Sequence, residues 1–202
     1  MAKKKKSVNV SKGYRERSVG TRELIQRFLI VCEGEKTEPN YFENFRVPKI
    51  VCVVKGFGNS TTKLVEDALR EKKKDDYDQV WCVFDRDEST IENFNDALRL
   101  AAANHIQVAY SNQSFELWYL LHFHYYDTSI PRHEYIKKLG NLLGHYYKKN
   151  DKNIYRELES RQDDAIRNAE RLLNSHQPLD PARNDPSTTV HLLVKELNRF
   201  IR

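Results

Sequence analysis

The sequence predicts an α/β protein with a mostly parallel central sheet of about four strands, flanked by helices. Two observations lead to this prediction. Short apolar runs of strand length alternate with segments of helical length, and the connections between the runs are long enough for crossovers. A third observation concerns the C-terminal part, where the strand pattern stops at about Ile130 and only helical segments follow. We therefore expect a C-terminal helical extension on an α/β core.

Four apolar runs carry the strand prediction, and they span Phe28–Cys32, Ile50–Val54, Val80–Phe84 and Ile106–Tyr110. The first three lack polar alternation and are rich in β-branched or aromatic residues, which is typical of strands buried on both faces. The fourth run is less apolar, so we expect it nearer an edge of the sheet.

Helical segments follow each run. In the core the predicted helices cover Thr37–Phe45, the region around Leu64–Leu69 with Asn59 or Ser60 as its cap, Ile91–Ala101, and a segment through Leu121 that Ser114 caps. In the extension they cover Arg132–Gly144, Arg156–Leu173 and a last helix with Asp185 as its cap and Pro186 at its first position.

The chain divides into residues 1–24 as a basic leader, 25–128 as the α/β core and 129–202 as the helical extension. Residues 1–27 hold nine Lys/Arg and two Glu, a net charge of +7, whereas the whole chain carries +5. The remaining residues therefore sum to −2. The leader is predicted to contact nucleic-acid phosphates, with a solvated, flexible tail as the alternative.

The compartment predicted from the sequence is the cytoplasm. No apolar run approaches the roughly 20 residues that cross a membrane, and no apolar segment at the N-terminus resembles a secretory signal. The three cysteines, Cys32, Cys52 and Cys82, each lie in an apolar run. An odd number without CxxC spacing is typical of buried cysteines and argues against disulfides or a zinc site.

Carboxylates follow the predicted strands at the ends where open α/β sheets place their sites. Glu33 follows the first strand, Asp85 and Asp87 follow the third, and Glu116 opens the helix after the fourth. Carboxylates that converge on one edge repel each other, and a hard cation with oxygen ligands is the usual compensation. The sequence therefore predicts Mg²⁺ or Mn²⁺ and the chemistry of phosphoryl transfer or phosphodiester cleavage.

Four ordered motifs carry a resemblance to a known family: VCEGEKTEPNYF (31–42), VFDRDE (83–88), SNQSFELWYLLHF (111–123) and NDPSTTVHLLV (184–194). With these motifs the chain resembles the RloB family from about Leu24 to the C-terminus. Glu33-Gly34 and the Asp85-Arg86-Asp87 pair also resemble the TOPRIM pattern of a glutamate and a DxD motif.

The resemblance implies a TOPRIM-like Rossmannoid core and a metal-dependent nuclease that cleaves DNA or RNA. It further implies a role in bacterial anti-phage defence, restriction-linked or by abortive infection, with an ABC/AAA-type ATPase encoded nearby. A homodimer is compatible with it. One departure is Gln113, which stands where the family usually has proline, so we expect a looser turn with Glu116 still in place.

Residue by residue, the resemblance makes Glu33 an acid/base or metal-bridging glutamate and makes Asp85 and Asp87 catalytic metal ligands. Glu38 and Glu116 resemble ligands of a second metal in OLD-type nucleases. The alternative for both is that they stabilise the first turn of a helix.

Four further residues are predicted to bind phosphate or nucleic acid. They are Lys36, Arg86, Ser187 and Thr188. Lys36 would neutralise the scissile phosphate. Ser187 and Thr188 would form a hydroxyl-rich helix N-terminus, for which ordinary helix capping is the alternative.

Aromatic and basic residues also occur together. Tyr125-Tyr126 and Tyr146-Tyr147 lie near His145, Lys148 and Lys149 in the sequence. Such residues stack on bases and hold the backbone of single-stranded nucleic acid, although tyrosines are equally suited to half-buried helix positions.

Three functions remain open from the sequence. The first is the metal-dependent nuclease. The second is a non-catalytic effector or sensor whose acidic site binds a cation or a nucleotide in a defence complex. The third is a phosphotransfer enzyme of another Rossmann-like class, although the Gly-Thr that normally follows its DxD is missing here. No GxxxxGK[ST] motif occurs, so the sequence lacks a P-loop.

Overall fold

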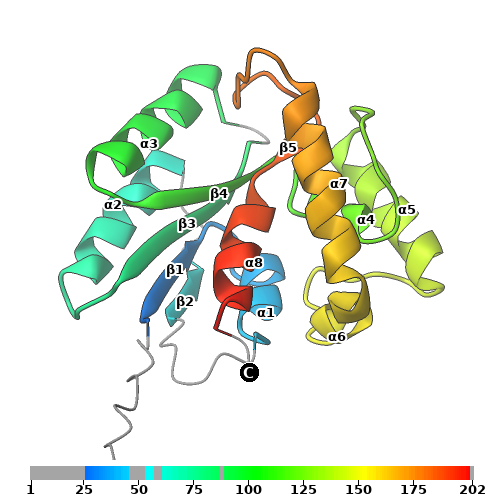
Figure 1. The fold of residues 1–202 in the computed structure, drawn as a ribbon, viewed down its shortest axis with the longest axis horizontal. Helices are drawn as coiled ribbons and strands as arrows, with labels where there is room; N and C mark the ends of the chain where they lie inside the picture. The colour runs from blue at the N-terminus through cyan, green and yellow to red at the C-terminus, as the bar shows by residue number, and fades with distance from the viewer. Residues whose placement is uncertain (1–25, 46–52, 57–60, 87–88, 201–202) are drawn as a thin grey trace, which may run out of the picture.

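The computed structural model of the chain describes residues 26–45, 53–56, 61–86 and 89–200. Its centre is a five-stranded sheet of order β2-β1-β3-β4-β5 (Figure 1). The strands are β1 (Phe28–Cys32), β2 (Val53–Gly56), β3 (Gln79–Asp85), β4 (Gln107–Asn112) and β5 (Ser187–Thr188). β1 to β4 are parallel, and β5 runs antiparallel to β4. The predicted α/β class with a mostly parallel sheet is therefore confirmed.

The strands β1, β3 and β4 form because their apolar runs are buried on both faces of the sheet. Alternate side chains of β1 enter two different cores: Phe28 and Ile30 lie in one apolar cluster, whereas Leu29 and Val31 lie in the other. All five residues of β1 are fully buried. The second expected strand began at Ile50, but residues 50–52 lie outside the described part of the chain, and the described strand spans Val53–Gly56.

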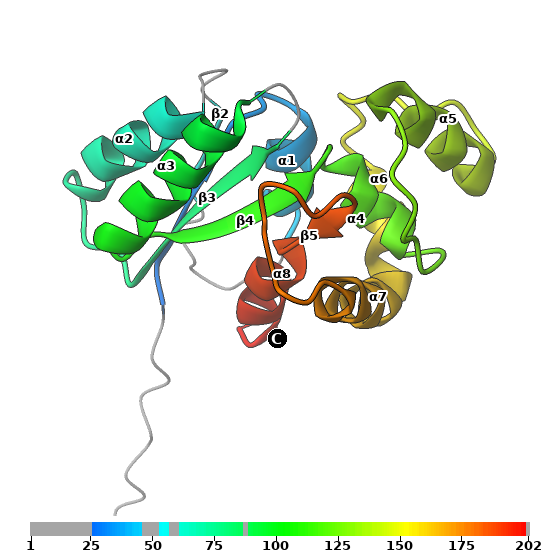
Figure 2. The same ribbon diagram turned by 90° about the horizontal axis from the view of Figure 1, so that it is seen from above.

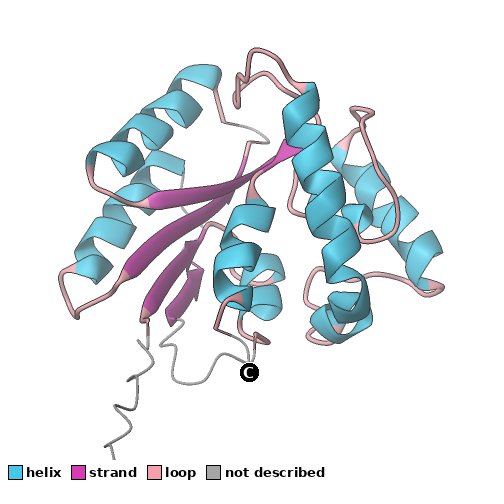
Figure 3. Cartoon of the chain, viewed as in Figure 1, coloured by secondary structure: helices cyan, strands magenta, loops and turns pink. Residues whose placement is uncertain are grey.

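Helices cover both faces of the sheet (Figures 1 and 3). α2 (Thr61–Lys72) and α3 (Ile91–Ala103) pack on one face, where they share an apolar cluster with the sheet. The other face is covered by α1 (Thr37–Phe42), α4 (Glu116–Leu121), α7 (Gln162–Ser175) and α8 (Val190–Asn198). α5 (Arg132–Leu143) and α6 (Ile154–Leu158) lie at the side of the molecule away from α2 and α3 (Figure 2).

The helical extension and the sheet share one core. The larger apolar cluster contains Ile30 and Trp81 from the sheet together with Tyr135, Leu172 and Leu193 from α5, α7 and α8. The extension also contributes β5, whose Thr188 pairs with Ser111 of β4. The helices after β4 are therefore held on the sheet both by apolar burial and by strand pairing.

For two helices of the extension, the predicted first and last residues are wrong. The segment Arg156–Leu173 is not one helix, because α6 ends at Leu158 and a 3₁₀ turn, Glu159–Arg161, separates it from α7. The last helix begins at Val190, not at Pro186. The residues expected at its start instead pair with β4, and the Asp185 carboxylate accepts hydrogen bonds from Gln113 and Ser129.

Helix starts and ends in the core also differ from the prediction. α4 begins at Glu116 after Phe115, and Ser114 makes no side-chain cap. α1 ends at Phe42, earlier than expected. Thr90 caps α3 by accepting a hydrogen bond from the Asn93 N–H. The expected caps of α2, Asn59 and Ser60, lie outside the described residues.

None of the described helices combines the length and the apolar character that a membrane crossing would need.

Candidate functional site

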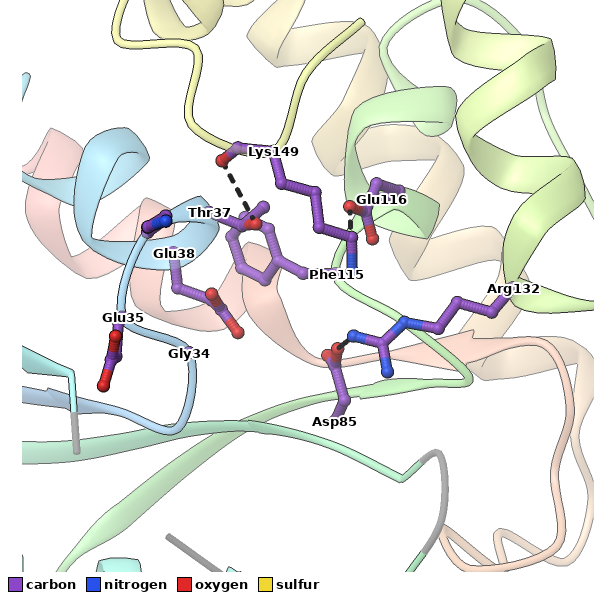
Figure 4. A pocket seen from close by; sticks show the side chains of 10 residues that line it. Gly34, Glu35, Thr37, Glu38, Asp85, Phe115, Glu116, Arg132 and Lys149 are labelled. Carbon is purple, nitrogen blue, oxygen red and sulfur yellow. Dashed lines mark hydrogen bonds and ion pairs between the residues drawn. The ribbon is translucent and has the colours of Figure 1, made fainter. Parts of the chain in front are cut away.

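A pocket of about 320 Å³ lies beside the C-terminal ends of β1 and β3, where the helical extension meets the sheet edge (Figure 4). Its walls come from the loop after β1, from α1, from the end of β3, from the start of α4 and from two segments of the extension. The lining residues are Gly34, Glu35, Lys36, Thr37, Glu38, Asp85, Phe115, Glu116, Arg132 and Lys149. Parallel strand ends share this edge, so the chain places three buried carboxylates around one cavity.

Glu33 and Asp85 lie on neighbouring strand ends. β1 and β3 pair in register, with Cys32 opposite Val83, so Glu33 emerges beside the last residues of β3. The Asp85 N–H donates to Glu33 Oε2 at 3.1 Å, and the Glu33 N–H donates to the Val83 carbonyl at 2.9 Å. Glu33 is therefore next to the pocket but does not line it, whereas the Asp85 side chain does.

Glu38 lies in the first turn of α1 and is only 4% exposed. Burial, reinforced by the nearby Glu116 charge, raises the pKa of its carboxyl group to about 7, although Lys149 and Arg132 act in the opposite direction. Glu38 therefore exchanges its proton near neutral pH, which is the range in which a carboxyl group can act as both general acid and general base.

Two cations of the extension face the carboxylates across the pocket. Arg132 Nη2 lies 3.7 Å from Asp85 Oδ2, and Lys149 Nζ lies 3.9 Å from Glu116 Oε1. Figure 4 shows Arg132 reaching in from α5 and Lys149 from the loop that precedes α6. Both separations exceed hydrogen-bonding distance, so the attraction is that of nearby charges.

The loop that carries Lys149 is fixed at the pocket by neutral groups. Thr37 Oγ1 donates to the Lys149 carbonyl at 3.4 Å, and the Tyr147 hydroxyl donates to Glu116 Oε1 at 3.4 Å. The Tyr147 ring also packs edge-on against Tyr119 of α4. The backbone of this loop therefore keeps Lys149 over the carboxylates.

The sequence prediction missed the site role of Arg132 and Lys149. Arg132 was expected only as a helix start, and Lys149 only as part of an aromatic and basic cluster. The one available signal was that both lie in a stretch with an excess of basic residues.

Of the residues predicted for the site, the structure brings Lys36, Glu38, Asp85 and Glu116 to the pocket. Arg86 points elsewhere, since its Nε donates to the Ala182 carbonyl at 3.0 Å. Asp87 lies outside the described residues.

Ser187 and Thr188 do not form a helix N-terminus. They form β5, and both are fully buried. The Ser187 hydroxyl donates to the Asn184 carbonyl, and the Thr188 hydroxyl donates to the Tyr110 carbonyl at 2.9 Å. The helix therefore begins later than predicted, at Val190, because pairing with β4 takes Ser187 and Thr188 into the sheet. The alternative of ordinary capping holds for Thr188, whose Oγ1 accepts a hydrogen bond from the Val190 N–H at 3.2 Å.

Mg²⁺ or Mn²⁺ was expected at this edge of the sheet. Carboxylate oxygens are the ligands that Mg²⁺ and Mn²⁺ prefer. In the part of the chain that the structure describes, however, no three Asp, Glu, His or Cys side chains are grouped closely enough to hold a metal ion. Asp85 and Glu116 each face a cationic side chain instead. The described residues by themselves therefore do not make a metal site.

The fold and the pocket together define a class: an open α/β protein with a buried acidic pocket, partly closed by cations, at the carboxyl edge of its sheet. The family model described as RloB-like protein matches residues 28–197, so the chain belongs to the RloB-like family. Searches among curated proteins and among solved structures find no match.

Proposed function

We propose that this protein hydrolyses phosphodiester bonds of nucleic acid in the pocket between β1, β3 and the helical extension. The observation that carries the proposal is the juxtaposition of Glu38, Asp85 and Glu116 with Arg132 and Lys149 around one cavity. Carboxyl groups serve proton transfer, and cationic groups bind phosphate oxygens and stabilise the charge that develops on them. A phosphodiester hydrolase uses groups for both of these tasks.

Within this proposal, Glu38 is the proton-transferring group. Its pKa of about 7 allows it to take a proton from the attacking water or to give one to the leaving oxygen at neutral pH. Lys36 is exposed at the rim of the pocket, and Lys149 lies deeper beside Glu116. Together with Arg132, these residues would hold the phosphate oxygens and orient the scissile bond.

The proposed cofactor is Mg²⁺ or Mn²⁺. Glu33, Asp85 and Asp87 would be its ligands, with Glu38 and Glu116 available to a second ion. When bound, the metal supplies Lewis-acid stabilisation and a more acidic water. Since the described residues alone do not make a metal site, this part of the proposal depends on Asp87, which completes the DxD pair in the sequence.

The biological setting proposed is anti-phage defence in the bacterial cytoplasm, together with an ATPase partner encoded nearby. Membership of the RloB-like family and the four motifs support it. The basic leader adds nine Lys/Arg within residues 1–27, and these are proposed to contact nucleic-acid phosphates.

One observation favours a second function, that of a non-catalytic effector or sensor. Arg132 lies beside Asp85 and Lys149 lies beside Glu116, so each carboxylate charge is partly offset by a side chain of the protein. The cationic side chains of the pocket are suited to binding an anionic nucleotide or nucleic-acid phosphate without cleaving it. This alternative makes the same binding contacts and lacks the chemical step.

The test compares the purified full chain with its Glu38→Gln and Asp85→Asn variants on labelled DNA and RNA, with Mg²⁺ or Mn²⁺ and with EDTA. We expect each variant to lose on the order of 100-fold or more in cleavage rate. Glu38→Gln should also remove the limb of the pH–rate profile near pH 7, since that limb belongs to its carboxyl group. Glu66→Gln, a change at an exposed position on α2, is the matched control.

Cleavage that survives both Glu38→Gln and Asp85→Asn would contradict the nuclease proposal at this pocket. Tight binding of nucleotide or nucleic acid by a wild-type chain that never cleaves it would favour the effector function. Calorimetric titration with Mn²⁺ separates the metal from the chemistry, because saturable binding that Asp85→Asn abolishes places the ion at this edge.

A further inference from the structure

A second cavity, of about 600 Å³, opens on the surface beside α5. One wall is α5 itself, with His133, Lys137 and Asn141, and the other is the segment from Gly144 to Tyr146 that turns back along the helix. We call this cavity the α5 groove. Its volume lies in the range of sites that hold one nucleoside-sized group.

Tyr146 is the most distinctive side chain of the α5 groove. It is 77% exposed, more than any other large hydrophobic side chain among the described residues. Its neighbour Tyr147 points the opposite way, is buried and bonds to Glu116. Anchoring of Tyr147 therefore holds the Tyr146 ring outward, with its face available to an aromatic partner.

The charge around the groove is positive. Residues 132–152 contain six Lys/Arg and two Asp/Glu, a net charge of +4, although residues 28–202 as a whole sum to −2. Lys137 and Lys148 are exposed, and neither forms an ion pair with any residue that the structure describes. Cationic side chains without local carboxylate partners attract a polyanion along this surface.

Two segments of the extension, the start of α5 and the loop after it, contribute to both the α5 groove and the pocket. At the start of α5, Arg132 faces Asp85 in the pocket, while the next residue, His133, lines the groove. In the following loop Tyr146 lines the groove, and Lys149 faces Glu116 three residues later. The groove and the pocket therefore have the start of α5 and the following loop in common.

We infer that the α5 groove binds a single-stranded segment of nucleic acid, with one base stacked on Tyr146 and a phosphate at Lys137, next to the pocket. The inference rests on the proposed function and names its substrate class. An unpaired strand fits because an exposed ring can stack only on a base whose face is free, whereas a duplex covers its base faces. DNA and RNA single strands share this chemistry.

The test measures equilibrium binding by fluorescence anisotropy in EDTA, so that no cleavage is needed. The probes are labelled single-stranded DNA, single-stranded RNA and duplex DNA of about 12 nucleotides, a length within the usual site size of such proteins. Full-length wild type is compared with Tyr146→Ala and Tyr146→Phe. Lys137→Gln is compared with Lys73→Gln, an exposed lysine just after α2.

Tyr146→Ala should weaken single-strand binding about 5- to 100-fold, because one base loses its stacking partner, while Tyr146→Phe keeps the ring and binds like wild type. Lys137→Gln should reduce the slope of log affinity against log salt by about 0.7, the effect of one phosphate contact, and Lys73→Gln should not. Duplex affinity should stay unchanged in Tyr146→Ala. A difference between the DNA and RNA probes identifies the natural strand.

Photo-cross-linking separates the α5 groove from the basic leader. An oligonucleotide with bromouracil at each position in turn should cross-link to the peptide that contains Tyr146, and mass spectrometry locates the adduct. Equal affinity of Tyr146→Ala and wild type, or cross-links confined to residues 1–27, would overturn the inference.

The groove proposal and the nuclease proposal can be contradicted separately. Wild-type protein that binds single strands through Tyr146 but cleaves nothing would contradict the proposed nuclease and leave the groove in place. Cleavage that needs Glu38 but does not change in Tyr146→Ala would support the nuclease and contradict the role of the groove.

Discussion

At the scale of single residues, the position of the Glu38 carboxylate depends on the space that Gly34 leaves for it. The carboxylate is buried against the loop after β1, and Gly34 in that loop leaves the room it occupies. A Cβ atom at position 34 would overlap Glu38 Oε2 and lie only 2.8 Å from Glu38 Cδ. The absence of a side chain at Gly34 is therefore part of what keeps Glu38 in the pocket.

The prediction is that Gly34→Ala destabilises the protein by about 1–3 kcal/mol through this overlap. In a Glu38→Ala background, where the carboxylate is absent, the same change should cost clearly less. The free energies of unfolding of the four proteins in this double-mutant cycle, measured with urea, give the coupling between the two positions. Additive costs would mean that the alanine is accommodated without disturbing Glu38.

At the scale of elements, the return of the chain after α5 creates both the groove and the Lys149 loop. Gly144 ends α5 in the left-handed conformation, with φ at 76°, and its N–H donates to the Gly140 carbonyl. This C-terminal cap reverses the chain so that His145 and Tyr146 lie along the helix. At Gly140 a side chain would lie 3.2 Å from the His145 carbonyl, so the small residue permits the close return.

Replacement of Gly144 tests this turn. Gly144→Ala should lower the free energy of unfolding by about 1 kcal/mol, since a left-handed alanine is strained even where space is open. Gly144→Asn should cost less, because asparagine tolerates this conformation. Urea denaturation of the three proteins provides the comparison, and equal stability of Gly144→Ala and wild type would show that α5 can end in another way.

At the scale of the whole molecule, two histidines are buried in the neutral state in the helical layer of the protein. His122 lies at the end of α4 against Trp118, and His191 lies in the first turn of α8. Burial lowers the pKa of each from 6.5 to about 4. The unfolded chain therefore binds protons between these values while the folded chain does not, and acid favours unfolding.

The free energy of unfolding should accordingly have its full histidine contribution above pH 6.5 and fall as the pH is lowered through 4, by about 3 kcal/mol per histidine. Glu38 is a single group that acts in the opposite direction. Because its pKa is raised in the folded state, its contribution to the free energy of unfolding declines as the pH rises from 4.5 through 7. Urea denaturation across this range should give a steeper pH dependence for wild type than for His122→Phe/His191→Leu. Parallel curves would argue against buried neutral histidines.

The strands and the carboxylates at their ends were predictable because both depend on local sequence. A run such as Phe28–Cys32 is apolar at every position, and the chain must turn where Glu33 and Gly34 follow it. Parallel strands share an edge, which brings Glu33 beside Asp85. Helix starts were less predictable. At Ser187 and Thr188 pairing with a distant strand moved the helix start to Val190, although Thr188 still accepts a hydrogen bond from the first N–H of that helix.

The sequence by itself determined the α/β class, the buried strands and the carboxylates at their ends, because apolar periodicity is a local property of the chain. Only the tertiary structure decided that Arg132 and Lys149 face these carboxylates, that Glu38 is buried enough to titrate near neutrality, and that Tyr146 stays exposed. These features arise where the extension packs on the sheet. Charge balance and burial at such a contact depend on residues far apart in the chain, and no local pattern encodes them.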